Sequence, residues 1–308
     1  MYTRKIGVLS LTHRLLITGG SGLLGVNWAV ARRQIDEIWL GLNDRHIFLD
    51  NTKSISLKGG LDRAIARTKP NIIIHTAAMA DVNGCEADLK AAVDVNCDLA
   101  ATYAKAAYDH GLRFVHISTD HLFDGFRPML DENTQCAPIN NYGYSKWLGE
   151  SAVLKAHPGA LILRINFFGW GPAYRHSFSD WIMESLRSGK PITLYSNVYF
   201  TPLYVGDTIT LAHQLIEKSA TGIYNLTSSD RISKFDFGLK VARAFGLDVD
   251  LIARAEYSPL HSVPRPLDMS LDNTKTRRLL KIDSLRLDEV IANLKYNEPL
   301  KKLFSLID

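Results

Sequence analysis

The chain has 308 residues, 46% hydrophobic and 22% charged, with a formal net charge of +4, which is ordinary for a globular protein with a sizeable core. Its Lys and Arg residues are scattered, which argues against nucleic-acid binding. No apolar run approaches the ~20 residues that span a bilayer, and three cysteines without C-x-x-C spacing fit a reducing compartment. We expect a cytoplasmic protein without membrane or nucleic-acid partners, in which residues 1–12 are a short extension and not a signal peptide.

The first half of the chain alternates short apolar runs with longer helical patterns. The runs predict strands at 13–20, 36–42, 71–79, 112–120 and 160–167, and the patterns predict helices at 23–33, 61–70, about 87–110 and from about 142 onward. Gly111 is a suitable stop for the third helix. Near-continuous Val, Ile and Leu strands separated by helices indicate a parallel sheet covered on both faces.

The alternation weakens after about residue 166. Helical patterns follow at 178–189, 205–218, 234–246 and 288–297, and short strands at 191–195 and 222–226. We predict an α/β fold, a doubly wound parallel sheet with a smaller mixed α/β domain sewn into it. The larger domain is expected to comprise 1–165 and about 196–230, and the smaller one about 166–195 and 231–308.

A glycine-rich turn lies directly between the first predicted strand and the first predicted helix. It places Gly19, Gly22 and Gly25 at three-residue spacing. Such glycines allow a tight turn, close approach of a pyrophosphate and close packing of helix on strand. The following helix N-terminus offers free N–H groups to the phosphates, so we predict a dinucleotide site.

The residues after the second predicted strand should read the adenosine ribose. Asn43 lies 18 residues after Gly25, about where an acidic residue would bind both hydroxyls of NAD. Arg45 and His46 follow and suit the 2′-phosphate of NADP, whereas Asp44 argues for NAD. On balance we expect NADPH rather than NADH.

One tyrosine has a lysine four residues later, Tyr142 followed by Lys146. On a helix, side chains at this spacing lie one above the other. A single pair of this kind can arise by chance, so its meaning depends on the rest of the chain.

Several stretches in this order resemble the extended short-chain dehydrogenase/reductase family, and within it the dTDP-4-dehydrorhamnose reductases and related nucleotide-sugar 4-ketoreductases. They run from Leu15 to about Leu280 and are "TGGSGLLG", "PNIIIHTAAMADVNGCE", "FVHISTDHLFDG", "PINNYGYSKWLGE", "LILRINFFG", "FTPLYVGD" and "RPLDMSLDNTK", with Asn96 between the second and third. The resemblance implies a Rossmann fold, NADPH or NADH as cofactor and a nucleoside-diphosphate sugar as substrate. It leaves a homodimer open.

The resemblance also assigns a catalytic triad. Tyr142 would donate its proton to the sugar ketone, and Lys146 would lower the tyrosine pKa from its usual value near 10, together with the oxidised nicotinamide, and would hold the nicotinamide ribose. Thr119 would polarise the carbonyl. Its neighbour Ser118 is the weaker candidate because side chains alternate in direction along a strand.

Further positions follow from the same resemblance. The expected cofactor contacts are Gly19, Ser21, Gly22, Leu23, Leu24, Gly25, Asn43, Arg45, Ser56, Leu57, Ala77, Ala78, Met79, Asn96, Tyr142 and Lys146. Where Ser56 stands the family often has aspartate, and Asn96 would act as a brace for the active-site loops. The expected substrate contacts are Val82, Asn83, Asn166, Phe167, Thr201 and Arg265. Asn166-Phe167 replaces the Ser-Trp of the rhamnose enzymes, which leaves the identity of the sugar open.

Three alternatives were weighed. The related dehydratases carry Thr-Asp-Glu, and this chain has Thr119-Asp120-His121, so the base carboxylate is missing. An NAD-dependent epimerase stays open, as does a non-catalytic regulatory subunit similar to the β subunit of methionine adenosyltransferase. His110, His116 and His121 fall on different elements, so no metal site is expected. Cys85 and Cys136 are expected to be buried hydrophobes.

Overall fold

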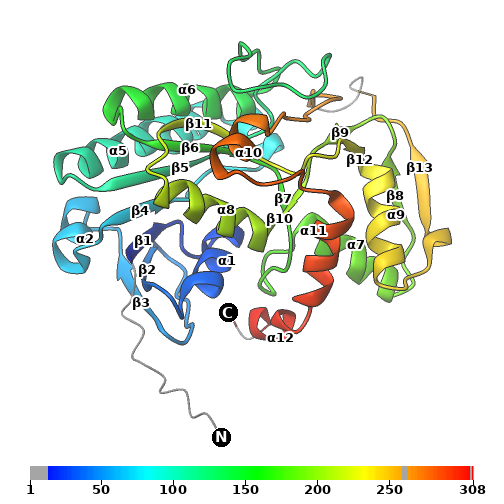
Figure 1. Ribbon diagram of the computed structural model, residues 1–308, viewed down its shortest axis with the longest axis horizontal. Helices are drawn as coiled ribbons and strands as arrows, with labels where there is room; N and C mark the ends of the chain where they lie inside the picture. Colours follow the sequence, from blue (N-terminus) through cyan, green and yellow to red (C-terminus); the bar gives the residue numbers. More distant parts are fainter. Residues whose placement is uncertain (1–12, 259–262, 306, 308) are drawn as a thin grey trace, which may run out of the picture.

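The central sheet contains seven parallel strands in the order β11-β6-β5-β4-β1-β2-β3 (Figure 1). The protein is described here by a computed structural model covering residues 13–258, 263–305 and 307, so the predicted N-terminal extension lies outside the described residues. The strands are β1 (Arg14–Thr18), β2 (Glu37–Leu42), β3 (Thr52–Ser56), β4 (Ile72–His75), β5 (Arg113–Thr119), β6 (Leu161–Ile165) and β11 (Gly222–Leu226).

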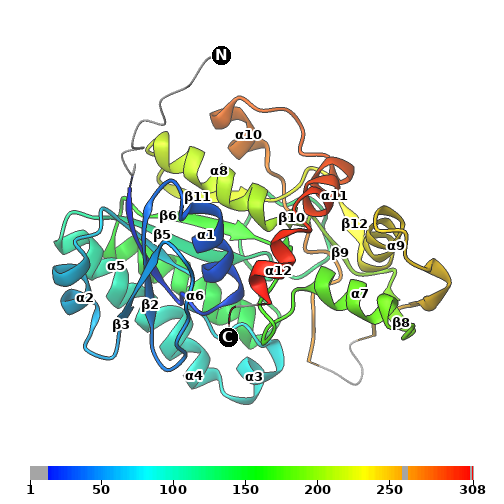
Figure 2. The ribbon, with the colours of Figure 1, turned by 90° about the horizontal axis from the view of Figure 1, so that it is seen from below.

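Strand β1 shows why helices cover both faces of this sheet. Leu15 and Ile17 belong to one apolar cluster, whereas Leu16 between them belongs to another, because successive side chains of a strand point to opposite faces. Helices α1 (Leu23–Arg32) and α8 (Val205–Glu217) pack on the first cluster's side, and α2 (Leu61–Thr68), α5 (Ala100–Asp109) and α6 (Asn141–Ala156) on the other (Figures 1 and 2). The predicted doubly wound α/β fold is confirmed.

The order of the strands fixes where a ligand can bind. From β1 the chain moves outward through β2 and β3, then returns to β4 on the other side of β1. At such a switch point the loops diverge and leave a crevice at the carboxyl ends of the strands. The glycine turn follows β1, and the Ala77–Met79 segment follows β4, so both predicted cofactor segments lie at this crevice.

In the first half of the chain, two details differ from the predicted elements. Strand β3 was not predicted, because it is an edge strand in which only Ile55 is buried. The helix predicted at about 87–110 is divided into α3 (Val82–Ala87), α4 (Leu89–Val93), a π-helical turn at Asp94–Leu99, and α5. Asp88 separates α3 from α4, and its side chain caps α4 by accepting from the N–H of Ala91.

Most of the rest of the chain forms a smaller lobe beside the carboxyl ends of the strands (Figure 1), whereas α10 (Thr274–Leu280) packs on β11 and α8 of the larger lobe. Its main helices are α7 (Phe178–Arg187), α9 (Lys234–Ala244) and α11 (Leu287–Tyr296), and the Phe237 ring of α9 packs on Phe178 and Phe200. The other elements are β7 (Phe167–Phe168), β8 (Ile192–Tyr195), β9 (Tyr199–Phe200), β10 (Leu203–Tyr204), β12 (Ile232–Ser233), β13 (Ile252–Ala255), a 3-10 turn (Val249–Leu251) and α12 (Leu300–Phe304).

Among the described residues, no helix is long and apolar enough to cross a membrane.

Candidate active site

The glycine turn packs backbone closely against backbone at the start of α1. Gly19 has φ +77, and a Cβ on it would lie 2.6 Å from the backbone nitrogen of Ala77; a Cβ on Gly25 would lie 2.5 Å from the carbonyl oxygen of Gly19. Helix α1 has Gly22 as its N-cap, with no capping side chain and no acidic residue in its first turn. Its first N–H groups and its positive dipole end are therefore available to an anion. These features fit the pyrophosphate of a dinucleotide.

The residues after β2 form an exposed, charged end of the crevice. Asn43, Asp44, Arg45 and His46 are all exposed. Asp44 pairs with the ammonium of Lys58 at 2.8 Å, and this contact lowers the pKa of its carboxyl group. The Arg45 guanidinium lies 3.8 Å from the ring centroid of Tyr174. The single acidic group that argued for NAD is thus paired with a cation.

The two residues predicted beside the adenine differ in exposure. Ser56 is exposed and its hydroxyl accepts from the N–H of Lys58. Leu57 is buried, and its backbone N–H donates to the carbonyl oxygen of Leu42. In the glycine turn, Leu24 is also buried, whereas Ser21 and Leu23 are half-buried.

Asn96 joins the segment after β4 to the start of α6. Its Oδ1 accepts from the Met79 N–H at 2.9 Å, and its Nδ2 donates to the Met79 carbonyl at 2.9 Å and to Ser145 Oγ at 3.0 Å. Ser145 in turn donates to the carbonyl oxygen of Tyr142. Asn96 is only 1% exposed, and its hydrogen bonds hold the Met79 segment against α6. Ala77 and Met79 are half-buried and Ala78 is exposed.

Thr119 and Tyr142 come from neighbouring elements, the end of β5 and the first turn of α6. Thr119 is buried, and its hydroxyl donates to Asp120 Oδ1 at 3.2 Å. The His121 ring stands edge-on to the Tyr142 ring, with the centroids 5.4 Å apart. Ser118 is buried with no hydrogen-bond partner for its hydroxyl among the described residues, and it is Thr119, not Ser118, that influences the pKa of Tyr142.

The pKa of Tyr142 differs in direction from the expectation. Burial raises it to about 12, Asp120 adds to the rise, and the hydrogen bond with Thr119 opposes it. The phenol therefore holds its proton at neutral pH, as a tyrosine of ordinary pKa also does, and it is a weaker acid than a free tyrosine. Lys146 is not among the groups that shift the pKa of Tyr142. The lowering expected from Lys146 is therefore absent when only the protein's own groups act.

Lys146 lies one helical turn after Tyr142, on the same helix. Its side chain is buried, and its ammonium donates to the carbonyl oxygen of Ile117 at 2.6 Å, with His116 Nε2 3.5 Å away. Burial lowers the pKa of Lys146 to about 8. The contact with β5 fixes the ammonium near the crevice in a dry setting, where charge interactions are stronger than in water.

The predicted substrate residues do not all face the crevice. Asn166 donates to Asp120 Oδ2 at 2.5 Å, which links it to Thr119. Thr201 is fully buried, and its hydroxyl accepts from the N–H of Leu271, so its side chain holds the fold together and has no surface for a nucleotide. Phe167 is half-buried, Val82 is buried, and Asn83 and Arg265 are exposed.

Lys234 is a candidate that the sequence analysis missed. Its ammonium lies 3.4 Å from the ring centroid of Phe200 and 4.8 Å from that of Phe178. Burial lowers the pKa of Lys234 to about 8, and its charge interacts with Asp120 and Arg265. As the first residue of α9, it resembled an ordinary helix lysine in sequence. Only tertiary packing brings it near Asp120.

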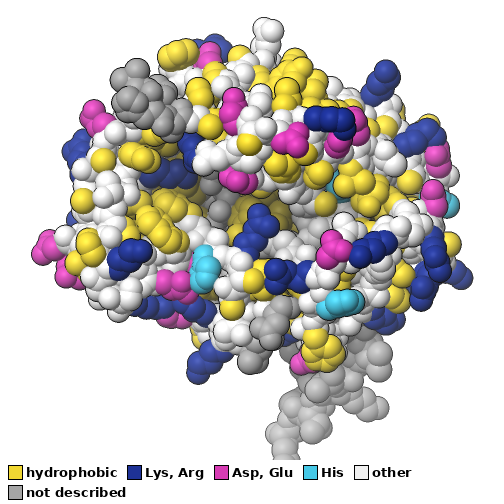
Figure 3. Space-filling model, turned by 180° about the vertical axis from the view of Figure 1, so that it is seen from behind, with side chains coloured by type: hydrophobic (Ala, Val, Ile, Leu, Met, Phe, Trp, Pro, Cys, Tyr) yellow, Lys and Arg dark blue, Asp and Glu magenta, His cyan; other side chains and the backbone are white. Residues whose placement is uncertain are grey.

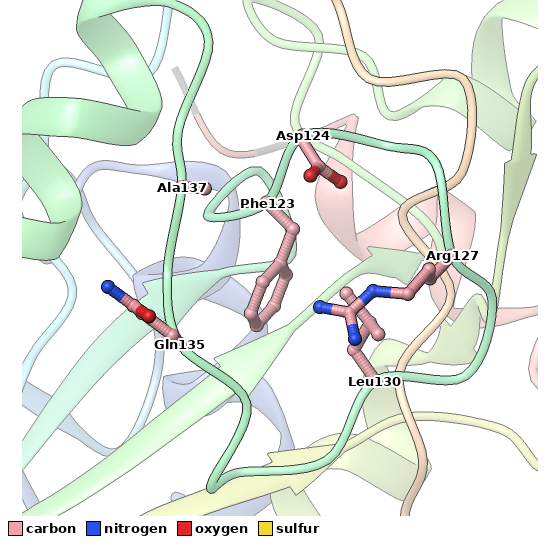
Figure 4. Close-up of a pocket in the computed structure, with 6 residues that line it drawn as sticks. All are labelled: Phe123, Asp124, Arg127, Leu130, Gln135 and Ala137. Carbon is pink, nitrogen blue, oxygen red and sulfur yellow. The ribbon is translucent and has the colours of Figure 1, made fainter.

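The surface opposite to the view of Figure 1 is hollowed near its middle, with apolar and Lys or Arg side chains around the hollow (Figure 3). A separate pocket of about 300 Å³ lies in the loop between β5 and α6 (Figure 4). Its lining residues include none of the predicted site residues and are Phe123, Asp124, Arg127, Leu130, Gln135 and Ala137. This pocket is therefore not the predicted active site.

One histidine group with metal-ligand spacing occurs among the described residues, and it contains none of His110, His116 and His121. The side chains of His13, Asp36 and His213 have ligand atoms within 4.8 Å of one another. Asp36 accepts from Arg32 at 2.7 Å, and His213 Nε2 accepts from the Trp28 N–H at 3.0 Å. These bonds already engage the carboxylate and one imidazole nitrogen, so we treat the group as structural.

Comparison with known families decides what kind of chain this is. The sequence model described as the RmlD substrate binding domain matches residues 13–295. The chain belongs to this family. Its recognition as an extended short-chain reductase of the dTDP-4-dehydrorhamnose reductase type is therefore confirmed, whereas its individual activity is a separate question.

Individual relatives point in two directions. The probable low-salt glycan biosynthesis reductase Agl14 of Haloferax volcanii is 31% identical over 73% of this chain and 77% of its own. The methionine adenosyltransferase 2 subunit beta of Danio rerio is 28% identical over 88% of this chain and 87% of its own. The crystal structure of Bacillus anthracis dTDP-4-dehydrorhamnose reductase in complex with NADP superimposes with a TM-score of 0.79, at 25% identity, over 92% of this chain and 99% of that one.

Proposed function

We propose that this chain is an NADPH-preferring reductase of the 4-keto group of a nucleoside-diphosphate deoxysugar, in sugar-nucleotide biosynthesis. The observation that carries the proposal is that β5 and α6 bring Thr119, Tyr142 and Lys146 together. The Tyr142 ring stands against His121, two residues after Thr119, and the Lys146 ammonium donates to the carbonyl oxygen of Ile117, two residues before it. A chain that only bound a dinucleotide would not need a protonated phenol beside a second hydroxyl.

The roles follow from the geometry. The nicotinamide cofactor, when bound, supplies the hydride that reaches the carbonyl carbon. Thr119, whose single hydroxyl proton is directed to Asp120 without substrate, turns that proton to the carbonyl oxygen, and Tyr142 gives the same oxygen its proton, which makes the alcohol. Tyr142 is protonated at neutral pH, as this step requires. Lys146 holds the nicotinamide ribose and stabilises the phenolate that Tyr142 leaves behind.

The cofactor groups are assigned to the two loops of the crevice. The glycine turn holds the pyrophosphate, Ala77–Met79 line the nicotinamide half, and Asn43, Ser56 and Leu57 lie at the adenosine. Arg45 binds the 2′-phosphate of NADPH. The ion pair between Asp44 and Lys58 supports this preference, because it offsets the negative charge that would repel the phosphate.

The substrate groups come from the smaller lobe and the loops that face it. Val82, Asn83, Asn166 and Phe167 surround the sugar, and Arg265 binds the diphosphate. Lys234 adds a second cation on this side, near Asp120. We also assign the sheet-containing portion, 1–165 and about 196–230, to the dinucleotide and the remainder to the nucleotide sugar.

A second candidate is a non-catalytic, NADP-binding regulatory subunit. It is supported by the match to methionine adenosyltransferase β subunits over most of both chains. An NAD-dependent epimerase is a third reading. A regulatory subunit would bind another protein stably, and an epimerase would be purified with NAD bound.

The deciding experiment incubates purified protein with NADPH and a panel of 4-keto nucleotide sugars carrying thymidine or uridine diphosphate. We expect oxidation of NADPH together with formation of one alcohol epimer. If no member of the panel is reduced while the protein co-purifies with a partner, the regulatory reading replaces this one. Interconversion of sugar epimers without net NADPH oxidation would establish the epimerase.

A further inference from the structure

The segment 169–177, between β7 and α7, reaches from the smaller lobe to the cofactor loops. Its Tyr174 is half-buried, and the hydroxyl donates to the carbonyl oxygen of Ser21, in the glycine turn, at 3.0 Å. The face of the same ring carries the Arg45 guanidinium at 3.8 Å. One side chain thus contacts both the turn predicted to hold the pyrophosphate and the cation predicted to read the ribose.

Both ends of this segment are anchored. Near its start, Asn27 of α1 donates to the carbonyl oxygen of Trp170 at 2.8 Å. At its end, Ser177 and Asp180 form a capping box, each side chain accepting from the other's backbone N–H. Tyr174 is therefore a fixed platform, whereas Arg45 is exposed and would otherwise sample many rotamers.

The stack on Tyr174 holds the Arg45 side chain in place before a cofactor binds, and this affects how tightly Arg45 can bind a phosphate. An arginine side chain loses conformational entropy when it binds a phosphate, and a guanidinium already stacked on an aromatic face loses less. The stack leaves the edge of the guanidinium, with its N–H donors, free to meet a phosphate. The smaller entropy loss strengthens binding of a cofactor that carries a 2′-phosphate. It does not help a cofactor with a hydroxyl at that position.

We propose that Tyr174 is a specificity-determining residue for the cofactor: it positions Arg45 for the 2′-phosphate and so favours NADPH over NADH. The inference rests on the proposed function, since it assumes that a dinucleotide binds at the glycine turn. Tyr174 is a positioning residue, because it acts through Arg45. It also makes cofactor choice depend on the segment that leads into α7 of the smaller lobe.

The test measures the affinities of NADPH and NADH separately by titration calorimetry, without substrate. Tyr174→Leu removes the ring face but keeps bulk, and should weaken NADPH about five- to tenfold while changing NADH less than about twofold. Tyr174→Phe keeps the stack and loses only the bond to Ser21, so the preference should be retained. Tyr296→Leu, at a position that is 85% exposed, is the matched control.

A double-mutant cycle tests whether Tyr174 acts on NADPH affinity through Arg45. Arg45→Met should reduce the preference, and adding Tyr174→Leu to it should cause little further loss, because the two residues act together. Equal loss of both cofactors in Tyr174→Leu, or additive losses in the double variant, would overturn the inference. Wild-type protein that prefers NADH would also overturn it, and wild-type protein that binds neither would remove the proposed function itself.

Discussion

The two ends of the cofactor crevice are built in opposite ways. At the proposed nicotinamide end, Asn96 and Lys146 are 1% and 2% exposed, and each makes hydrogen bonds of 2.6 to 2.9 Å to backbone groups. At the adenosine end, Asn43, Asp44 and Arg45 are all exposed. Buried polar groups are costly to leave unsatisfied, whereas exposed charges are screened by solvent. Rate and folding should therefore depend on the first end, and cofactor choice on the second.

The largest effect is expected from Tyr142→Phe, which removes the proton donor and keeps the ring beside His121. General acid catalysis contributes about 10²–10⁴-fold to rate, so kcat should fall by at least about 100-fold. NADPH affinity should change little, since only one hydroxyl is lost. Steady-state turnover and cofactor titration on the same preparation check this.

Undiminished turnover in Tyr142→Phe would remove the mechanism. A matched control is Tyr144→Phe, two residues later on the same helix, where the ring is 40% exposed and packs beside Trp147. That variant should retain full activity, which would show that a missing phenol on α6 is not harmful in itself.

Parts of this buried end could be predicted from the sequence and parts could not. Apolar runs and the glycine turn identify the sheet and the crevice, and the spacing of Tyr142 and Lys146 identifies their shared helix face, because these are local patterns. The orientation of Thr201 could not be predicted, since its side chain is buried by packing against the distant Leu271 segment.

The difference between local patterns and contacts between distant segments also explains which residues the sequence did not reveal. Strand β3 has little apolar pattern to reveal it, since three of its five residues are exposed. The role of Lys234 depends on the rings of Phe178 and Phe200, and Tyr174 meets Ser21 across 153 residues of sequence. Contacts of this kind arise only when the smaller lobe folds against the sheet.

The second prediction concerns Asn96, whose amide makes three hydrogen bonds in the interior. Asn96→Ala leaves the Met79 backbone groups without these partners, so the free energy of unfolding should fall by roughly 2 kcal/mol. Urea denaturation measures this. Ser145→Ala, which removes only one of the three bonds to Asn96, should cost less. Equal costs for the two variants would contradict the bracing role.

The third prediction concerns charge on the substrate side. Lys234→Met keeps packing on Phe200 but removes the cation, so the affinity for thymidine or uridine diphosphate should fall about tenfold, while NADPH affinity stays the same. Titration calorimetry with each ligand checks both halves. A variant that binds nucleoside diphosphates as well as wild type does would exclude Lys234 from the substrate site.

The pH dependence of that affinity follows from the same lysine. Burial lowers the pKa of Lys234 to about 8, so the cation is present below this pH and is lost as the pH rises through it. Wild-type affinity for the diphosphate should therefore decline between about pH 7.5 and 9.5. In Lys234→Met the affinity should be flat over this range, and a parallel decline in both proteins would assign the titration to another group.

The smallest effect is expected at the adenosine end. Lys58→Met leaves the Asp44 carboxylate without the cation that now lies 2.8 Å away, so negative charge remains beside the proposed 2′-phosphate site. NADPH affinity should fall by less than about threefold, because exposed charges are screened, and added salt should erase the difference. NADH affinity and the melting temperature should not change. A loss that persists in high salt would mean that Lys58 contacts the cofactor directly, and the contrast between a dry catalytic end and a screened selective end would no longer hold.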